Sequence, residues 1–291
     1  MVDNAILSNI LNYGPVFLLI AVRAFTMIVA APLLSSDAIP MVAKFALAGF
    51  AAFAVLPTAE IYMAANTSSG MITLPGGEVT DLRFEPFSLR FALLLVGEGI
   101  IGLIIGFYLT IIFATFSTAG QFFSLQMGFG ASETFDPIGQ VENPLMGQYF
   151  NLVSMLIFLF IGGFHQLFLG GFWRSVQTIN IVSLVEGRET VVNMLASGLS
   201  RLFLDAIIIS LPILGTLFLT SLATGLISKA APQINILSEG FPISITTAFI
   251  LLFASLPFLV EAFGRVIDSG FSSIQTLYTH IGRQITEGGG M

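Results

Sequence analysis

The length of the uncharged apolar runs is the feature that most restricts what this chain can fold into. Neither the run from Gly99 to Ser132 nor the run from Asn143 to Trp173 contains a lysine, arginine, aspartate or glutamate. A helix that crosses the hydrocarbon core of a bilayer needs about 20 apolar residues. Each run is therefore longer than one simple span, which indicates a bend, an added helix or a re-entrant segment.

Composition supports a membrane protein and excludes several other classes. Of the 291 residues, 55% are hydrophobic and 9% are charged, whereas soluble domains carry about 25% charged residues. The net charge of −7 provides no basic patch for nucleic acid. Cysteine is absent and the two histidines, His165 and His280, are far apart, so we expect no disulfide, no metal site and no cofactor.

Six apolar stretches approach or exceed the length of a membrane span. They lie at 10–34, 43–65, 88–118, 145–172, 200–228 and 241–265, and we expect a loop at 173–201 between the fourth and the fifth. None shows the alternation of apolar and polar residues that is typical of membrane barrels. We therefore expect an all-α, polytopic integral membrane protein, with about six long kinked hydrophobic helices in one domain.

Two charged residues interrupt these stretches. Arg23 is the first cation of the chain, so the N-terminus does not fit a cleaved signal peptide. Its depth in the run predicts a buried partner. Glu98, Gly102 and Gly106 recur at every fourth position, on one helix face, and the two glycines would let another helix approach closely. Glu98 is then either a proton relay or a residue that bonds a neighbouring helix, and we favour the second.

A polar stripe marks a later helix. Thr216, Thr220, Thr224 and Ser228 are spaced every four residues, so one helix face is lined with hydroxyl groups. Such a face predicts contact with protein or water rather than lipid. Whether it lines a conduit or meets another subunit stays open at this point.

No pattern for catalysis is present. The sequence has no nucleophile elbow, no phosphate-binding loop and no histidine placed beside a carboxylate. We expect a protein without enzymatic activity.

Four segments that contain glycine, proline or charged residues at fixed spacings together resemble a known family. This is the FliR family of flagellar type III export proteins and their injectisome homologues. The segments are Arg23-x8-Pro32-x7-Pro40-x3-Lys44, GEGIIGLIIGF at 97–107, AGQFFSLQMGFGASETFDP at 119–137 and KAAPQINILSEGFP at 229–242. The resemblance extends over nearly the whole chain, and the last two segments are its most specific parts.

The resemblance implies an architecture and a set of partners. It implies a FliP-like part at about 1–190, a FliQ-like hairpin at 195–270 and a C-terminal tail at 271–291. It also implies a core complex with FliP and FliQ, joined by FlhB and FlhA, in the bacterial inner membrane at the flagellar basal body. Unfolded flagellar proteins would pass through this complex.

The resemblance also assigns roles to two connections. A pore plug would include Met127, Gly128, Phe129, Gly130, Phe135, Asp136 and Pro137. A turn at the cytoplasmic entrance would include Lys229, Pro232, Gln233, Asn235, Gly240, Phe241 and Pro242. The entrance assignment puts both termini outside the cytoplasm, whereas the distribution of arginines between the connections predicts the opposite orientation.

Two other functions compete with this interpretation. A small-molecule transporter would show inverted repeats and paired ionisable residues at mid-membrane, and the sequence offers little of either. A membrane scaffold without a pore would have no use for a plug loop rich in glycine and phenylalanine.

Overall fold

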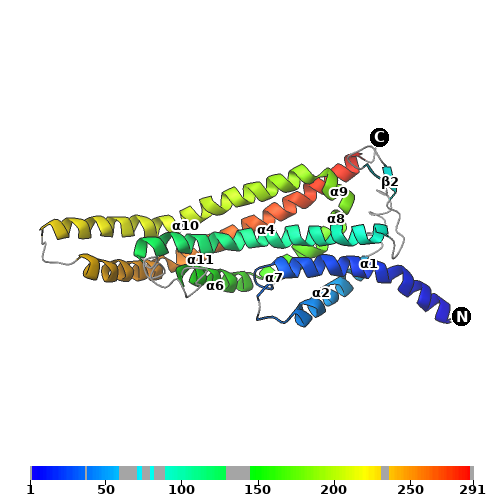
Figure 1. Ribbon diagram of the computed structural model, residues 1–291, viewed down its shortest axis with the longest axis horizontal. Coiled ribbons are helices and arrows are strands. Elements are labelled where there is room, and N and C mark those ends of the chain that lie inside the picture. Colours follow the sequence, from blue (N-terminus) through cyan, green and yellow to red (C-terminus); the bar gives the residue numbers. More distant parts are fainter. Residues whose placement is uncertain are drawn as a thin grey trace. The chain divides into compact units, whose positions relative to one another are not determined.

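The long apolar runs of the sequence form helices, and the computed structural model confirms an all-α polytopic membrane protein (Figure 1). The residues that the structure describes are 2–36, 38–58, 71–73, 79–81, 89–128, 145–230 and 236–288. Within these ranges, four helices are long and apolar enough to cross a membrane. A fifth span results if the interrupted pair Leu145–Phe160 and Gly163–Thr178 is counted as one.

Each predicted stretch corresponds to a helical segment. The long helices are α1 (Val2–Ala30), α2 (Met41–Val55), α4 (Leu89–Met127), α6 (Leu145–Phe160), α10 (Arg188–Ala230) and α11 (Ile236–Gly288). Short helical pieces follow α2 and α6: η1 (Leu56–Thr58), α7 (Gly163–His165), the π-helix η2 (Gln166–Trp173), α8 (Arg174–Thr178) and α9 (Ile181–Glu186). Two short antiparallel strands, β1 (Met71–Thr73) and β2 (Val79–Asp81), pair with Met71 opposite Asp81.

Two expected connections and the expected C-terminal tail differ from the structure. The presumed loop after Trp173 is helical, as α8, α9 and the start of α10. The second half of the expected turn at 229–242 belongs to α11, because the apolar run that follows Pro242 extends its helix backward to Ile236. The expected C-terminal tail continues the same helix to Gly288.

The chain divides into two compact units that do not follow chain order. The first contains residues 1–110, 163–196 and 270–291, and the second contains 111–162 and 197–269. In the first unit α2 lies alongside α1 (Figure 1), where the rings of Phe25 and Phe45 stack with centroids 4.1 Å apart.

Aromatic side chains form the core of the second unit. Phe116 of α4 and Phe150 of α6 both contact Phe263 of α11, with ring centroids 4.3 and 5.4 Å apart. Phe113 meets Phe158 edge to face at 5.4 Å. Three helices are thereby joined through large rings, each of which excludes a large apolar area from its surroundings.

An irregular helical turn lies in the first unit. The segment Gln166–Trp173 is a π-helix, a form that is rare and occurs mostly as single-turn bulges, often at functional sites. The hydroxyl of Tyr278, which is buried, donates a hydrogen bond of 2.7 Å to the carbonyl oxygen of Gly171. This bond satisfies a backbone acceptor within the irregular turn and ties α11 to it.

Candidate functional site

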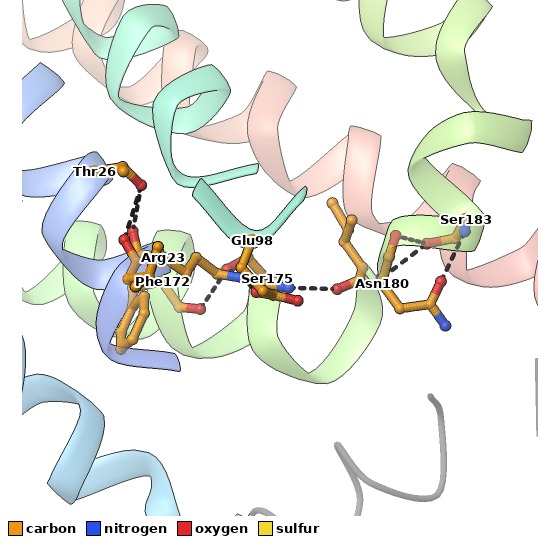
Figure 2. Close-up of polar contacts among 9 residues, drawn as sticks. Arg23, Thr26, Glu98, Phe172, Ser175, Asn180 and Ser183 are labelled. Carbon is orange, nitrogen blue, oxygen red and sulfur yellow. Dashed lines mark hydrogen bonds and ion pairs between the residues drawn. The ribbon is translucent and has the colours of Figure 1, made fainter. Parts of the chain in front are cut away.

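A buried ion pair is the centre of the polar contacts in the first unit (Figure 2). The side chain of Arg23 is 0% exposed and that of Glu98 is 1% exposed. Arg23 Nε donates to Glu98 Oε2, and Nη2 donates to the carbonyl oxygen of Ile179 at 2.9 Å. A longer contact of 3.4 Å joins Nη1 to Ser175 Oγ.

The segment that receives the guanidinium is itself fixed by hydrogen bonds. Ser175 Oγ donates to the carbonyl oxygen of Phe172 at 2.6 Å. Asn180 and Ser183 form a reciprocal capping box at the start of α9, in which Ser183 N–H donates to Asn180 Oδ1 at 2.7 Å. Figure 2 shows these contacts continuing from the ion pair to the cap. Arg23 therefore connects α1, α4 and the α8–α9 region.

The environment of this pair suits a structural role. A single charge in such a place is costly, and removing one partner of a buried pair leaves the other charge uncompensated. Here the carboxylate and a backbone carbonyl oxygen both face the guanidinium. The contacts join Glu98 to α1 through Arg23, and its assignment to helix bonding or to proton relay stays a prediction.

The glycines of the same stripe bring α4 close to α1. A Cβ atom placed on Gly102 would overlap the carbonyl oxygen of Arg23 and the hydroxyl of Thr26. A Cβ on Gly106 would meet Ala30 in the same way. One turn later, Thr110 Oγ1 donates to the carbonyl oxygen of Ala30 at 2.9 Å. The ion pair and the glycine contacts thus lie along one helix interface.

The threonine stripe lies on α10 in the second unit. Thr216, Thr220 and Thr224 are half-buried, and each hydroxyl donates to the carbonyl oxygen four residues earlier, at 2.9 to 3.0 Å. The hydroxyls are therefore satisfied within their own helix and need no outside partner. The threonine face of α10 therefore offers few free polar groups. Its assignment to a conduit or to a subunit contact stays a prediction.

The plug and entrance candidates fall only partly within the described residues. Met127 ends α4 in a fully buried position, and Gly128 follows it with a φ of +88° that favours glycine. Lys229 lies exposed near the end of α10, whereas Gly240, Phe241 and Pro242 lie within α11. The remaining candidates, Phe129, Gly130, Phe135, Asp136, Pro137, Pro232, Gln233 and Asn235, lie outside the described residues.

Sequence reasoning missed the residues that complete the ion-pair site. Ser175 and Ile179 lie in a stretch that was expected to be a loop, and a backbone carbonyl leaves no signal in a sequence. The pattern Asn180-x-x-Ser183 was the one available indication of a helix start there. In the described part of the chain, no group of three or more acidic or histidine side chains is arranged to hold a metal ion.

Comparisons with known proteins place this chain among bacterial secretion components. The family described as bacterial export proteins, family 1, matches residues 15–270. The chain is 36% identical over 187 residues to the flagellar biosynthetic protein FliR of Borreliella burgdorferi, covering 64% of this chain and 70% of the relative. It is 26% identical over 278 residues to FliR of Bacillus subtilis, covering 95% and 99%.

A relative with a different name is also similar. The surface presentation of antigens protein SpaR of Shigella flexneri is 28% identical over 200 residues, which cover 68% of this chain and 75% of the relative.

We expect Arg23 and Glu98 to show strong energetic coupling. Arg23→Met or Glu98→Leu alone should lower the free energy of unfolding by about 3–5 kcal/mol, because each leaves an unpaired buried charge. The double variant should lose about 2–3 kcal/mol less than the sum of the two. Unfolding in mild detergent can be followed through the fluorescence of Trp173, the single tryptophan.

A more exposed ion pair in the same chain serves as the control. Arg201 and Asp205 are 3.6 Å apart, and the Arg201 side chain is 57% exposed. Arg201→Met should cost less than about 1 kcal/mol. If the losses at Arg23 and Glu98 add to within about 0.5 kcal/mol, the two residues are independent and the account of this site is wrong.

Two glycines of α4 should respond in opposite directions to alanine. Gly102→Ala should destabilise the protein by about 1–3 kcal/mol, because the new methyl group overlaps the backbone of α1. At Gly99 a Cβ would lie 3.6 Å from Thr26 Cγ2, an ordinary contact. Gly99→Ala should be neutral or stabilising by up to about 1 kcal/mol, since alanine favours a helix. Equal melting temperatures for the two variants would contradict the close approach of α1 and α4.

Proposed function

The chain belongs to the family of bacterial export proteins, family 1, and on this premise we propose that it is a core subunit of the flagellar type III export gate. It forms, with FliP and FliQ, the inner-membrane conduit for unfolded flagellar proteins. A protein of this kind has no active site; its work is to shape a passage and to hold neighbouring subunits.

The length of one exposed apolar face supports an assembled state. On α10, large apolar side chains are exposed from Leu199 to Ile227. At about 1.5 Å per residue this face extends for about 42 Å, whereas the hydrocarbon core of a bilayer is about 30 Å thick. To fit entirely within the core, the helix would need a tilt of about 45°, which exceeds the usual range of about 0–40°.

Other subunits are the natural cover for the excess apolar surface. Apolar side chains that extend beyond the hydrocarbon core would otherwise contact water. Exposing this surface to water costs about 25 cal/mol of free energy for each Å² of apolar area. The names of the relatives, flagellar biosynthetic protein FliR and surface presentation of antigens protein SpaR, support membership in a type III export apparatus. FliP- and FliQ-like subunits fit this requirement, because the resemblance assigns them to the same core.

The remaining assignments follow from the family resemblance. Phe129 and Phe135 act in the plug that closes the passage at rest, with Asp136 and Pro137 shaping its turn. The connection between α10 and α11 faces the cytoplasmic entrance, where FlhB packs, and FlhA lies below it. Met127 belongs to the same proposed plug, and it is fully buried at the end of α4.

Affinity purification of the tagged chain in mild detergent tests the proposal. The expected result is a stable particle that contains FliP- and FliQ-like proteins in fixed ratio to this chain. Purification of Gly102→Ala should recover less of this particle, whereas Gly99→Ala should recover as much as the natural chain. A monodisperse particle that holds this chain alone, from cells that produce the partners, would overturn the proposal and favour a stand-alone transporter.

A further inference from the structure

The helices α4 and α6 touch at two glycines of the second unit. A Cβ atom placed on Gly120 of α4 would lie 2.5 Å from the carbonyl oxygen of Met146 and 2.8 Å from the backbone of Gly147. A Cβ on Gly147 would in turn lie 3.1 Å from the carbonyl oxygen of Ser117. Each glycine therefore faces the backbone of the other helix, in the kind of close approach that small residues allow. We call this contact of Gly120 with Gly147 the glycine crossing.

Two aromatic rings pack beside the glycine crossing. Phe123 of α4 meets Phe150 of α6 edge to face, with ring centroids 4.9 Å apart. The two side chains are 0% and 1% exposed. Aromatic pairs prefer this geometry, so the rings stabilise the contact between α4 and α6 next to the glycines.

The glycine crossing lies close to both ends of the connection between α4 and α6. Gly147 is two residues after Leu145, where α6 begins, and Gly120 is eight residues before Gly128, which follows the last residue of α4. At about 1.5 Å per residue these offsets are about 3 and 12 Å. The end of α4 is sharp, because Gly128 has a φ of +88° and its N–H donates to the carbonyl oxygen of Leu125 at 3.2 Å. The position of each end of the connection therefore depends on the helix that carries it.

The connection itself does not keep α4 and α6 together. Residues 129–144 number 16, and a fully extended chain of that length reaches about 53–58 Å. Contacts between the two helices must therefore determine how far apart the ends of the connection lie. The glycine crossing is such a contact, and because it joins backbone to backbone, a shift there moves the end of one helix relative to the start of the other.

We propose that Gly120 and Gly147 are positioning residues for the plug, and that their crossing is a fixed base that stays closed when the plug opens. This inference rests on the proposed function, which assigns Phe129 and Phe135 of the connection to the plug. A passage that seals again after each substrate needs its plug to return to the same place. A base that holds both ends of the connection limits where the plug can lie. The plug then opens by movement within the connection, while α4 and α6 stay in contact.

Alanine at Gly120 tests the positioning role. Carbon contacts are normally about 3.5–4.0 Å long, so the new methyl group must move α6 away from α4 by about 1 Å. The complex with its copurifying subunits is placed in vesicles that contain trapped potassium ions, and the efflux of potassium is measured. Gly120→Ala should raise the efflux severalfold, to a rate close to that of the plug variant Phe129→Gly with Phe135→Gly. Gly264→Ala should leave it unchanged, because a Cβ on Gly264 of α11 meets no atom of the described residues within 4 Å.

The plug variant separates the two ways in which this test can fail. If the plug variant leaks and Gly120→Ala does not, although Gly120→Ala holds its partners in the normal ratio, the glycine crossing does not position the plug. The inference is then wrong and the proposed function stands. If neither variant leaks, the chain lines no plugged passage, and the proposed function fails together with the inference.

A disulfide across the glycine crossing tests whether the base stays closed. A Cβ on Gly147 would lie 3.3 Å from Ser117 Oγ. A disulfide joins Cβ atoms about 3.5–4.5 Å apart, so cysteines at these two positions are placed to bond. The chain has no cysteine of its own, and Ser117→Cys or Gly147→Cys alone is the control. The oxidised double variant should contain the disulfide in the assembled complex and should export flagellar subunits as fast as the reduced protein.

Two outcomes of the disulfide test would overturn the proposal. If the disulfide does not form in the complex, α4 and α6 do not cross at these glycines there. If it forms and blocks export until a reductant is added, the two helices must separate for substrates to pass. The glycine crossing would then be a moving part rather than a fixed base.

Discussion

The buried contact between Arg23 and Glu98 is the constraint on which the arrangement of the first unit depends. A guanidinium and a carboxylate that are both enclosed can be tolerated only if their partners stay in place. The pair therefore fixes α1 against α4, and the bond from Arg23 to the carbonyl oxygen of Ile179 fixes the α8–α9 region against both. The close approach at Gly102 makes these contacts possible, because a larger residue there would push the two helices apart.

Irregular backbone in this unit is supported by specific side chains. The capping box of Asn180 and Ser183 starts α9, and Tyr278 satisfies a carbonyl oxygen in the π-helix. The second unit is built differently, from the rings of Phe116, Phe150 and Phe263 and from helices whose outer faces stay apolar. Polar contacts are central to the first unit and aromatic packing to the core of the second, and both units expose large apolar side chains.

Much of this architecture was predictable from the sequence. The six apolar stretches predicted the helices, because length and the absence of charge decide membrane spans almost independently of tertiary contacts. The spacing of Glu98, Gly102 and Gly106 predicted one packed face. The partner of Glu98 was not predictable: Arg23 is 75 residues away, and no local pattern reports such a contact. The sequence did not indicate that the stretch after Trp173 is helical, because its helical signals are short. Its contribution to the ion-pair site is a backbone carbonyl oxygen, which leaves no signal in a sequence.

The central claim is that other protein subunits cover part of the exposed apolar face of α10. Benzoylphenylalanine, placed singly at Leu199, Leu211, Leu219 or Ile227 in cells that contain the native partners, tests this most directly. The account predicts that irradiation links one or more of these positions to FliP- or FliQ-like proteins, whereas a buried control position at Phe116 gives no such product. If all four exposed positions link only to lipid, the face lies in the bilayer and the claim is contradicted.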